Sequence, residues 1–583
     1  MKKRILAILL SAASAISLAG CAGFGGGGSS SSSAPASSAA PSSSAAASAA
    51  GSSSAAAEPA GLVTPNGEFP IVTEPYTLTV LVPDAPYISE LNENNEFTKW
   101  YEEYTGVHVE YTEVAYDSKR EKVNLLLASG EYPDIMMWSG INAADEVLYG
   151  SQGIFLRLND LIEEYGLETK KVFDAYAELP GAITTPDGNI YALPNINDCF
   201  HCNNTVRAWI NQDWLDNLGL ATPTTTDEFY EVLKAFKEKD PNGNGKADEI
   251  PMMGCNKDGN MLQVWPFLMN SFVYYDGGHI FLDLDNGNVE FIATTDAYRE
   301  GIRYIHKLFE EGLIDPTSLT QTEEQFKQVG TNPDAQLVGV GTSAFWWKFL
   351  GYDRDTADQR ANSYTALAPL KGPAGVQYSP TTATAATNGM LVITDKCKNP
   401  EVAFRWADAL YNEEVTYRSQ LGIEGTNYEK APEGSLGINK KPGLYVKIVQ
   451  DTMAEERTTD AGNVFMGNRS SDWRLGEVAD YSDPATQWAQ EPRLYNETND
   501  KYFPYSDTSK KLPASLYLLP EESSDYARLK AQIETYAKES LVAFFTGNKN
   551  VETDWDAYVA EFEKLELPKY LELNQTAYDR QYK

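Results

Sequence analysis

The segment from Asp240 to Pro251 (DPNGNGKADEIP) carries oxygen-bearing side chains at alternate positions. It places Asp, Asn, Asn and Gly at positions 1, 3, 5 and 6 of an EF-hand-type loop and Asp at position 9. Pro251 stands at position 12, where Glu is usual, so Glu249 at position 10 would complete the ligand set. The candidate ligands are Asp240, Asn242, Asn244, Lys246 through its backbone carbonyl, Asp248 and Glu249. The pattern predicts a structural Ca²⁺ site, and its alternative is a plain Asn-Gly turn after a helix.

Cys199 and Cys202 (DCFHC) form a CxxC pair, which occurs both in redox motifs and as half of a zinc site. The sequence has no second CxxC, and this pair does not open a predicted helix. In an oxidising environment we expect one local disulfide between them, with Cys255 and Cys397 either paired or free.

The sequence lacks the signatures of several common catalytic sites, namely HExxH, GxSxG and a phosphate-binding loop. Its four histidines are widely separated and suggest no catalytic triad. An enzyme that uses paired carboxylates, such as a glycosidase or polysaccharide lyase, stays open as an alternative, as does a peptidase. The net charge of −36 excludes nucleic-acid binding, because the phosphates would be repelled.

The N-terminus is typical of an exported lipoprotein. Residues 1–20 comprise a cationic start, an apolar run too short to span a bilayer, and small residues before Cys21. Leu18 to Cys21 (LAGC) resembles a bacterial lipobox, in which the cysteine receives a diacylglycerol and later fatty acyl chains such as palmitate. Residues 21–63 form a tether rich in Ser, Ala and Gly. We expect a lipid-anchored protein on the extracellular face of the cell membrane, and the alternative is an ordinary signal peptide with an incidental cysteine.

The elements that must position these groups begin with an alternation of strands and helices. Tyr76–Val82, Val107–Tyr111 and Asp134–Trp138 are strand-like, and helical patterns ending at Gly106 and Gly130 separate them. Ser118 and Glu121 are spaced as a capping box for the second helix. The order β-α-β-α-β predicts a parallel, doubly wound sheet that binds ligands beyond the carboxyl ends of its strands.

A second α/β unit begins with the strand Ala208–Asn211 and a helix capped by Thr225 and Glu228. The buried face of that helix should contain Phe229, Val232, Leu233 and Phe236. Two further amphipathic helices are expected near the C-terminus, one ending at Gly547 and one starting at Trp555.

Several strings then resemble extracellular solute-binding protein family 1, the lipid-anchored receptors of ABC importers for carbohydrates. The matching strings are Gly188–Pro194 (GNIYALP), Asp213–Leu220 (DWLDNLGL), Asp240–Pro251, Asn399–Glu401 with Phe404 and Asp408, Gly422–Gly425 (GIEG), and the end of the chain to Arg580. Their order and spacing carry the resemblance across most of residues 76–580.

The resemblance implies an α/β, two-lobed, periplasmic-binding-protein-like fold with discontinuous lobes joined by hinge strands. By analogy the N-terminal lobe comprises 64–190 and 388–425, and the C-terminal lobe comprises 195–380 and 430–583, of which 430–522 is poorly assigned. The chain would cross between lobes near Tyr191–Asn195, near Thr381–Thr394 and after Gly425. Hinge closure over a bound solute is the expected motion.

The resemblance also implies a monomeric binding protein, not an enzyme, that captures a carbohydrate, with an oligosaccharide favoured, and delivers it to ABC transporter permease subunits. Sugar rings stack on aromatic side chains, and their hydroxyls bond to carboxylates and amides. The candidate contacts are Trp138, Asn195, Asp198, Trp265, Trp346, Trp347, Asn388 and Glu424. A peptide-binding surface lipoprotein is the other alternative.

Overall fold

The structure is a computed structural model that describes residues 62–583, except 85–87, 89–90, 92–93, 257–260, 278–280, 352–358, 382–384, 449–456, 483–488 and 514. The predicted leader, the lipidation site at Cys21 and nearly all of the tether lie outside the described residues. Residues 60–583 form one compact unit by their contacts. Two main sheets organise this unit, each with its own hydrophobic core.

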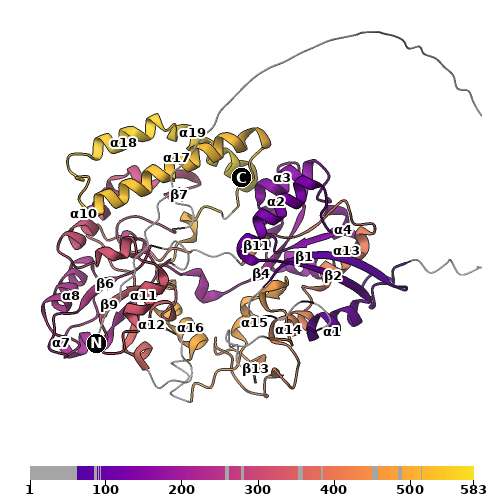
Figure 1. Cartoon of the computed structure of the whole chain (residues 1–583), viewed down its shortest axis with the longest axis horizontal. Coiled ribbons are helices and arrows are strands. Elements are labelled where there is room, and N and C mark those ends of the chain that lie inside the picture. Colours follow the sequence, from indigo (N-terminus) through magenta and orange to yellow (C-terminus); the bar gives the residue numbers. More distant parts are fainter. Residues whose placement is uncertain are drawn as a thin grey trace, which may run out of the picture. The chain divides into compact units, whose positions relative to one another are not determined.

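The N-terminal lobe is built on a six-stranded sheet of order β14-β4-β11-β3-β1-β2 (Figure 1). Its strands are β1 (Tyr76–Pro83), β2 (Val107–Val114), β3 (Ile135–Met137), β4 (Ala192–Asn197), β11 (Ala386–Ile393) and β14 (Asn468–Arg469). Its helices are α1 (Glu96–Thr105), α2 (Lys119–Ser129), α3 (Ala143–Ser151), α4 (Asn159–Tyr165), α5 (Glu168–Ala175), α6 (Leu179–Ile183), α13 (Pro400–Ala409) and α14 (Glu413–Leu421).

The predicted β-α-β-α-β opening is present, and β1 pairs in parallel with both β2 and β3. The sheet as a whole is mixed, because β11 runs antiparallel to both β3 and β4. The parallel pairing predicted for the opening therefore holds for β1, β2 and β3, and it does not extend to β11. The physical reason is that β11 comes from a distant part of the chain and need not follow the crossover rule of a local βαβ unit.

The capping box predicted at Ser118 and Glu121 is absent. A 3₁₀ turn, Tyr116–Ser118, runs directly into α2, and the hydroxyl of Ser118 donates to the carbonyl of Ala115. Ser118 consequently lacks the extended conformation that an N-cap requires. The helix ends as expected at Gly130, which adopts φ 75°.

The C-terminal lobe contains a four-stranded sheet of order β10-β5-β9-β6. Its strands are β5 (Ala208–Asn211), β6 (Ile250–Met253), β9 (Val338–Thr342) and β10 (Tyr364–Leu367), and β7 (Leu282–Asp285) with β8 (Asn288–Phe291) forms a separate hairpin. Its helices are α7 (Gln212–Leu218), α8 (Thr226–Glu238), α9 (Val264–Met269), α10 (Asp296–Glu310), α11 (Glu323–Gly330), α12 (Trp347–Leu350), α16 (Gln490–Lys501), α17 (Pro520–Phe545), α18 (Trp555–Lys564) and α19 (Leu567–Tyr582).

The local predictions for this lobe are confirmed. Thr225 and Glu228 form a reciprocal capping box on α8, and the four predicted apolar residues of that helix are all buried. Figure 1 shows α17, α18 and α19 together in the C-terminal part of the chain. Their apolar faces join the core of the C-terminal lobe through residues such as Leu529, Phe544 and Tyr570.

The segment after α14 differs from the expected lobe boundaries. It contains the short strands β12 (Tyr428–Lys430) and β13 (Tyr445–Lys447), then β14 and α15 (Ser471–Leu475). Phe465 and Met466 are fully buried in the N-terminal core, and β14 pairs with β4. Residues 430–583 are therefore not all part of the C-terminal lobe, because this apolar segment completes the N-terminal one. The chain reaches the C-terminal core only later, at Leu494 of α16.

Candidate functional site

Three sequence-predicted residues lie at one edge of the N-terminal sheet. Trp138 directly follows β3, and its backbone N–H donates to the carbonyl of Met390 on β11 at 2.6 Å. Asn195 on β4 faces Thr387 on β11, beside Asn388. Because β3 and β4 both run antiparallel to β11, the carboxyl ends of β3 and β4 meet the beginning of β11. Neighbouring strands thus bring Trp138, Asn195 and Asn388 to a common edge.

Trp138 has an unusual backbone and a partly accessible ring. Its φ is 49°, in the left-handed region that bulky side chains rarely adopt. The ammonium group of Lys119 lies 3.9 Å from the ring centroid of Tyr116 and 5.8 Å from that of Trp138. Burial lowers the pKa of Lys119. Lys119 thus lies near two aromatic rings beside the carboxyl end of β3, and neither Lys119 nor Tyr116 had been identified from the sequence.

The two asparagines at this edge differ in exposure and partners. Asn195 is only 4% exposed, and its Oδ1 accepts a hydrogen bond from the N–H of Gly467 at 3.0 Å. Asn388 is partly exposed, and its Nδ2 donates to the carbonyl of Ala182 in α6 at 3.0 Å. Asn195 therefore holds the segment that leads into β14, whereas Asn388 retains some accessible surface.

Asp198 follows β4 and lies next to Tyr176, which sequence reasoning had not singled out. The Tyr176 hydroxyl is 3.5 Å from Oδ2 of Asp198. Burial raises the pKa of Asp198, and it is also the main cause of the raised pKa of Tyr176. The half-buried pair presents a carboxylate and a phenol that can bond to polar ligand groups.

The predicted tryptophans separate into core and accessible residues. Trp265 is 8% exposed and lies in the C-terminal core near Phe545, and Trp346 is 4% exposed against Trp209. This burial leaves little surface of either ring for stacking. Trp347 is partly exposed and stacks on Phe345 with centroids 4.5 Å apart. Three aromatic residues in a row, Phe345, Trp346 and Trp347, indicated an aromatic surface here, and the structure leaves Phe345 and Trp347 partly exposed.

Glu424 is exposed on the turn between α14 and β12. Among the described residues, no hydrogen bond or ion pair connects it with Trp138, Asp198 or Asn388. Its charge adds to the effect of burial in raising the pKa of Tyr428 to about 12. The structure does not bring Glu424 into contact with the other candidates.

The predicted calcium loop lies between α8 and β6 and is folded around its own polar groups. The Asp240 carboxylate accepts hydrogen bonds from the N–H groups of Asn244 and Gly245 at 3.1 and 2.9 Å. Gly245 has φ 75°, which permits this tight turn. The side-chain amides of Asn242 and Asn244 both donate to Asp248. Hydrogen bonds thus gather Asp240, Asn242, Asn244 and Asp248 around one turn. Lys246, whose side chain is exposed, would offer only its backbone carbonyl to a cation.

A buried oxygen in this loop fits a bound cation. Oε1 of Glu249 is buried without a hydrogen-bond partner among the described residues. Burial raises the pKa of Glu249, and the charges of Asp240 and Asp248 raise it further. Three neighbouring carboxylates and two amide oxygens are hard ligands of the kind that Ca²⁺ prefers. The donor set is therefore compatible with Ca²⁺, although Pro251 departs from the usual EF-hand pattern.

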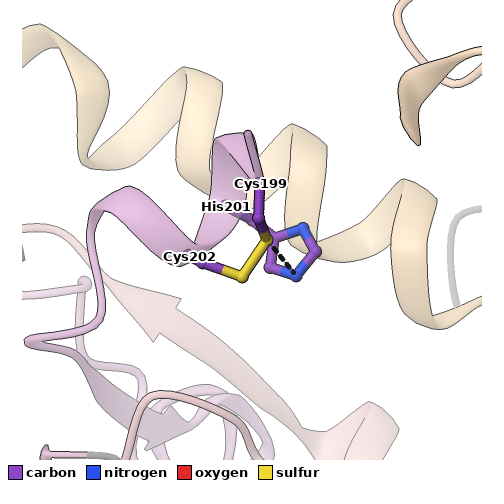
Figure 2. Close-up of side chains that lie close together, drawn as sticks. All are labelled: Cys199, His201 and Cys202. Carbon is purple, nitrogen blue, oxygen red and sulfur yellow. Dashed lines mark hydrogen bonds between the residues drawn. A yellow bond between two sulfur atoms is a disulfide. The ribbon is translucent and has the colours of Figure 1, made fainter. Parts of the chain in front are cut away.

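The expected disulfide is confirmed, since the structure joins Cys199 to Cys202 (Figure 2). The Sγ of Cys199 lies 3.5 Å from Nε2 of His201. Burial holds the pKa of His201 well below its usual value, and the positive charges of Arg474 and Arg207 contribute. Both thiols are consumed by the disulfide, so this group is not a thiolate zinc site in the oxidised protein. Cys255 and Cys397 are buried in different hydrophobic clusters and do not pair with each other.

Over the described residues, the structure contains no helix that is both long and apolar enough to cross a bilayer.

Comparisons with known proteins match most of the chain. The profile of the family described as bacterial extracellular solute-binding protein matches residues 74–417. The fructooligosaccharide ABC transporter substrate-binding protein FusA of Streptococcus pneumoniae serotype 4 (strain ATCC BAA-334 / TIGR4) is 30% identical over 525 residues, which cover 88% of this chain and 91% of FusA. Lipoprotein LipO of Bacillus subtilis (strain 168) is 26% identical over 380 residues, which cover 63% of this chain and 70% of LipO.

Solved structures of FusA share the fold. One is FusA in complex with kestose, at a TM-score of 0.69, and another is an EF-hand mutant of FusA in complex with fructo-nystose, at 0.68. Each is 28% identical, and the match covers 86% of this chain and 99% of the FusA chain in that structure. The two-lobed, periplasmic-binding-protein-like fold is thereby confirmed. The chain belongs to the bacterial extracellular solute-binding protein family.

Proposed function

We propose that this protein captures an oligosaccharide between its two lobes and delivers it to the permease subunits of an ABC transporter. The observation that carries the proposal is the similarity to FusA, which extends over 91% of FusA and both lobes of this chain. FusA is a fructooligosaccharide-binding protein, so short fructooligosaccharides such as kestose are the first ligands to test. The protein binds its sugar and does not transform it.

Accessible aromatic and polar side chains from both lobes would form the binding surface. Trp138 contributes a ring at the carboxyl end of β3, held in a left-handed conformation that functional sites often retain. The stacked pair Phe345 and Trp347 contributes a second aromatic surface from the C-terminal lobe. Asp198 and Asn388 would bond to sugar hydroxyls. Each such hydrogen bond adds roughly 0.5–1.5 kcal/mol, so affinity requires several contacts and lobe closure.

The loop from Asp240 to Glu249 would bind one structural Ca²⁺. Its support is the buried Oε1 of Glu249, which has no hydrogen-bond partner among the described residues and feels the charges of Asp240 and Asp248, together with the EF-hand of FusA. The ion would neutralise the mutual repulsion of Asp240, Asp248 and Glu249 and fix the connection from α8 to β6.

Anchoring through a lipid on Cys21 would keep this monomeric receptor near the permease in the membrane. The lipobox-like sequence supports it, and LipO is a relative that is itself a lipoprotein. The Ser- and Ala-rich tether would separate the folded part from the bilayer.

A thermal-shift screen against kestose, other oligosaccharides and short peptides tests the ligand class. We expect a rise in melting temperature with at least one oligosaccharide and none with peptides. Trp347→Ala should lose most of that rise, whereas Phe69→Ala, which removes an exposed ring stacked on Tyr104, should keep it. A response to peptides alone would replace the carbohydrate proposal with the peptide-binding alternative.

A further inference from the structure

The Cys199–Cys202 disulfide lies in the segment that joins the two main sheets. β4 of the N-terminal sheet ends at Asn197 and β5 of the C-terminal sheet begins at Ala208, with the 3₁₀ turn η2 (Phe200–Asn203) between them. Both cysteines flank or belong to this turn, as Figure 2 shows. Any change at this disulfide therefore acts on a connection between the lobes.

The two cysteine residues differ in exposure. Cys199 is 3% exposed, whereas Cys202 is partly exposed. A thiolate approaching from solvent would meet the Sγ of Cys202 first, and the buried Sγ of Cys199 would be the leaving sulfur.

His201 is positioned to interact with that leaving sulfur. Its Nε2 lies 3.5 Å from the Sγ of Cys199, and its Nδ1 lies 3.5 Å from Oε2 of Glu491 on α16. Arg207 also holds the turn, by donating from its guanidinium to the carbonyl of His201 at 2.5 Å. With a proton on Nδ1 directed to Glu491, Nε2 is an acceptor that faces the sulfur.

The cross-link constrains only a local turn. It joins residues three positions apart, and a disulfide that closes so short a loop restricts the unfolded chain less than one that closes a long loop. A contribution to global stability therefore does not explain why His201 and the carboxylate of Glu491 lie beside this disulfide.

We propose that Cys199–Cys202 is a thiol–disulfide exchange site for a small dithiol. A thiolate of the dithiol bonds to the Sγ of Cys202, and the electron pair of the S–S bond passes to the Sγ of Cys199. Cys199 takes up the proton that the dithiol has released, and its S–H then donates to Nε2 of His201. The second thiolate of the dithiol closes onto the first and releases Cys202 as a thiolate, which is then protonated. The protein disulfide gains two electrons and two protons, and the dithiol is oxidised to its cyclic disulfide.

The exchange site is also next to the proposed carbohydrate contacts. The His201 ring packs edge-on against Phe345 with centroids 6.1 Å apart, and Phe345 stacks on Trp347. Asp198 directly precedes Cys199. An effect of reduction on ligand affinity would rest on the proposed function, but the exchange chemistry itself is measured without any carbohydrate.

The first experiment maps the attacked sulfur in the native full-length protein. Brief treatment with glutathione, whose single thiol forms a mixed disulfide but cannot close a ring, is followed at once by excess N-ethylmaleimide, which traps the freed protein thiol, and then by peptide mass spectrometry. We expect glutathione on Cys202 and the maleimide on Cys199 in the same molecule. Adducts mainly on Cys199, or a disulfide that resists dithiothreitol until circular dichroism reports unfolding, would overturn the proposal.

A second experiment tests His201 by equilibrium titration with dithiothreitol. His201→Leu should lower the equilibrium constant for reduction by roughly threefold to tenfold, because it removes one hydrogen bond from the reduced form. His108→Leu replaces an exposed histidine on β2 and should leave the constant unchanged. Equal constants for His201→Leu and the wild type would contradict the role of His201. If His201→Leu does not fold, the mass-spectrometric map of adducts on the wild-type protein still tests whether the exchange reaction takes place at Cys202.

Discussion

The hydroxyl of Tyr517 donates a hydrogen bond to Oε2 of Glu146 at 2.9 Å, although the two residues are 371 positions apart in the chain. Glu146 belongs to α3 of the N-terminal lobe, and Tyr517 lies in the segment before α17 of the C-terminal lobe. Glu146 is 1% exposed, and its Oε1 has no hydrogen-bond partner among the described residues. Burial raises the pKa of Glu146 to about 7, and the neighbouring charge of Asp145 adds to this while Tyr517 opposes it.

This carboxyl group should make stability depend on pH. Its ordinary pKa is 4.5, so between about pH 4.5 and 7 the folded state binds more protons than the unfolded state, and stability falls as pH rises. The loss from this group should reach about 3 kcal/mol at neutral pH. Glu146→Gln should remove it, as measured by urea unfolding of both proteins across this range.

Asp283 should add a similar pH dependence to the wild-type curve, because burial also raises its pKa to about 7. The difference between wild type and Glu146→Gln, rather than the wild-type curve alone, isolates Glu146. Tyr517→Phe should shift the transition to higher pH, since it removes a donor that favours the ionised form. An identical pH dependence in wild type and Glu146→Gln would refute the assignment.

Asp408, part of the strings that resemble the solute-binding family, has a structural role that can be tested. Its carboxylate accepts hydrogen bonds from the N–H groups of Leu167, Glu168 and Thr169 at 3.1, 3.0 and 2.7 Å, at the start of α5. Asp408→Ala should lower the free energy of unfolding by about 2–3 kcal/mol, because buried N–H groups lose their acceptor. Asp174→Ala, at an exposed position on the same helix, should change it by less than about 0.5 kcal/mol. Similar values for both variants in urea titrations would refute this role.

Local sequence patterns predicted the parts of the fold that depend on neighbouring residues. The capping box of Thr225 and Glu228 and the strand Ala208–Asn211 formed as expected, because their signals lie within a few positions. The capping box at Ser118 failed because the preceding turn set its backbone, which the residue types alone do not reveal.

The site was predicted less completely because exposure is a tertiary property. The sequence treats Trp346 and Trp347 alike, yet packing against Trp209 buries the first and leaves the second accessible. The addition of β14 to the N-terminal sheet and the contact of Glu146 with Tyr517 join distant segments that carry no mutual sequence signal.

Removal of Ca²⁺ should destabilise the protein. A ligand that binds only the folded state at a hundredfold excess over its Kd contributes roughly 2.7 kcal/mol. A chelator should therefore lower the melting temperature of the wild type, and Asp240→Ala and Asp248→Ala should each remove most of this response. Asp174→Ala should respond to chelator like the wild type. An unchanged melting temperature, together with no metal in the purified protein, would leave the loop as a simple turn.

Replacement of Cys21 should abolish lipid anchoring. The Cys21→Ala variant offers no thiol for the diacylglycerol, so it should lose palmitate labelling and either be released or retain its leader. Cell fractionation and labelling with radioactive palmitate measure both outcomes. Continued labelling and membrane retention of the variant would contradict the lipobox assignment.

The central claim is that the protein binds an oligosaccharide without transforming it, and calorimetric titration with kestose and a panel of related glycans tests it most directly. We expect saturable heat with at least one glycan, a weaker affinity by roughly tenfold for Trp347→Ala, and recovery of the intact glycan by chromatography. Release of shorter sugars by the pure protein, or no heat with any glycan alongside saturable binding of peptides, would contradict the claim.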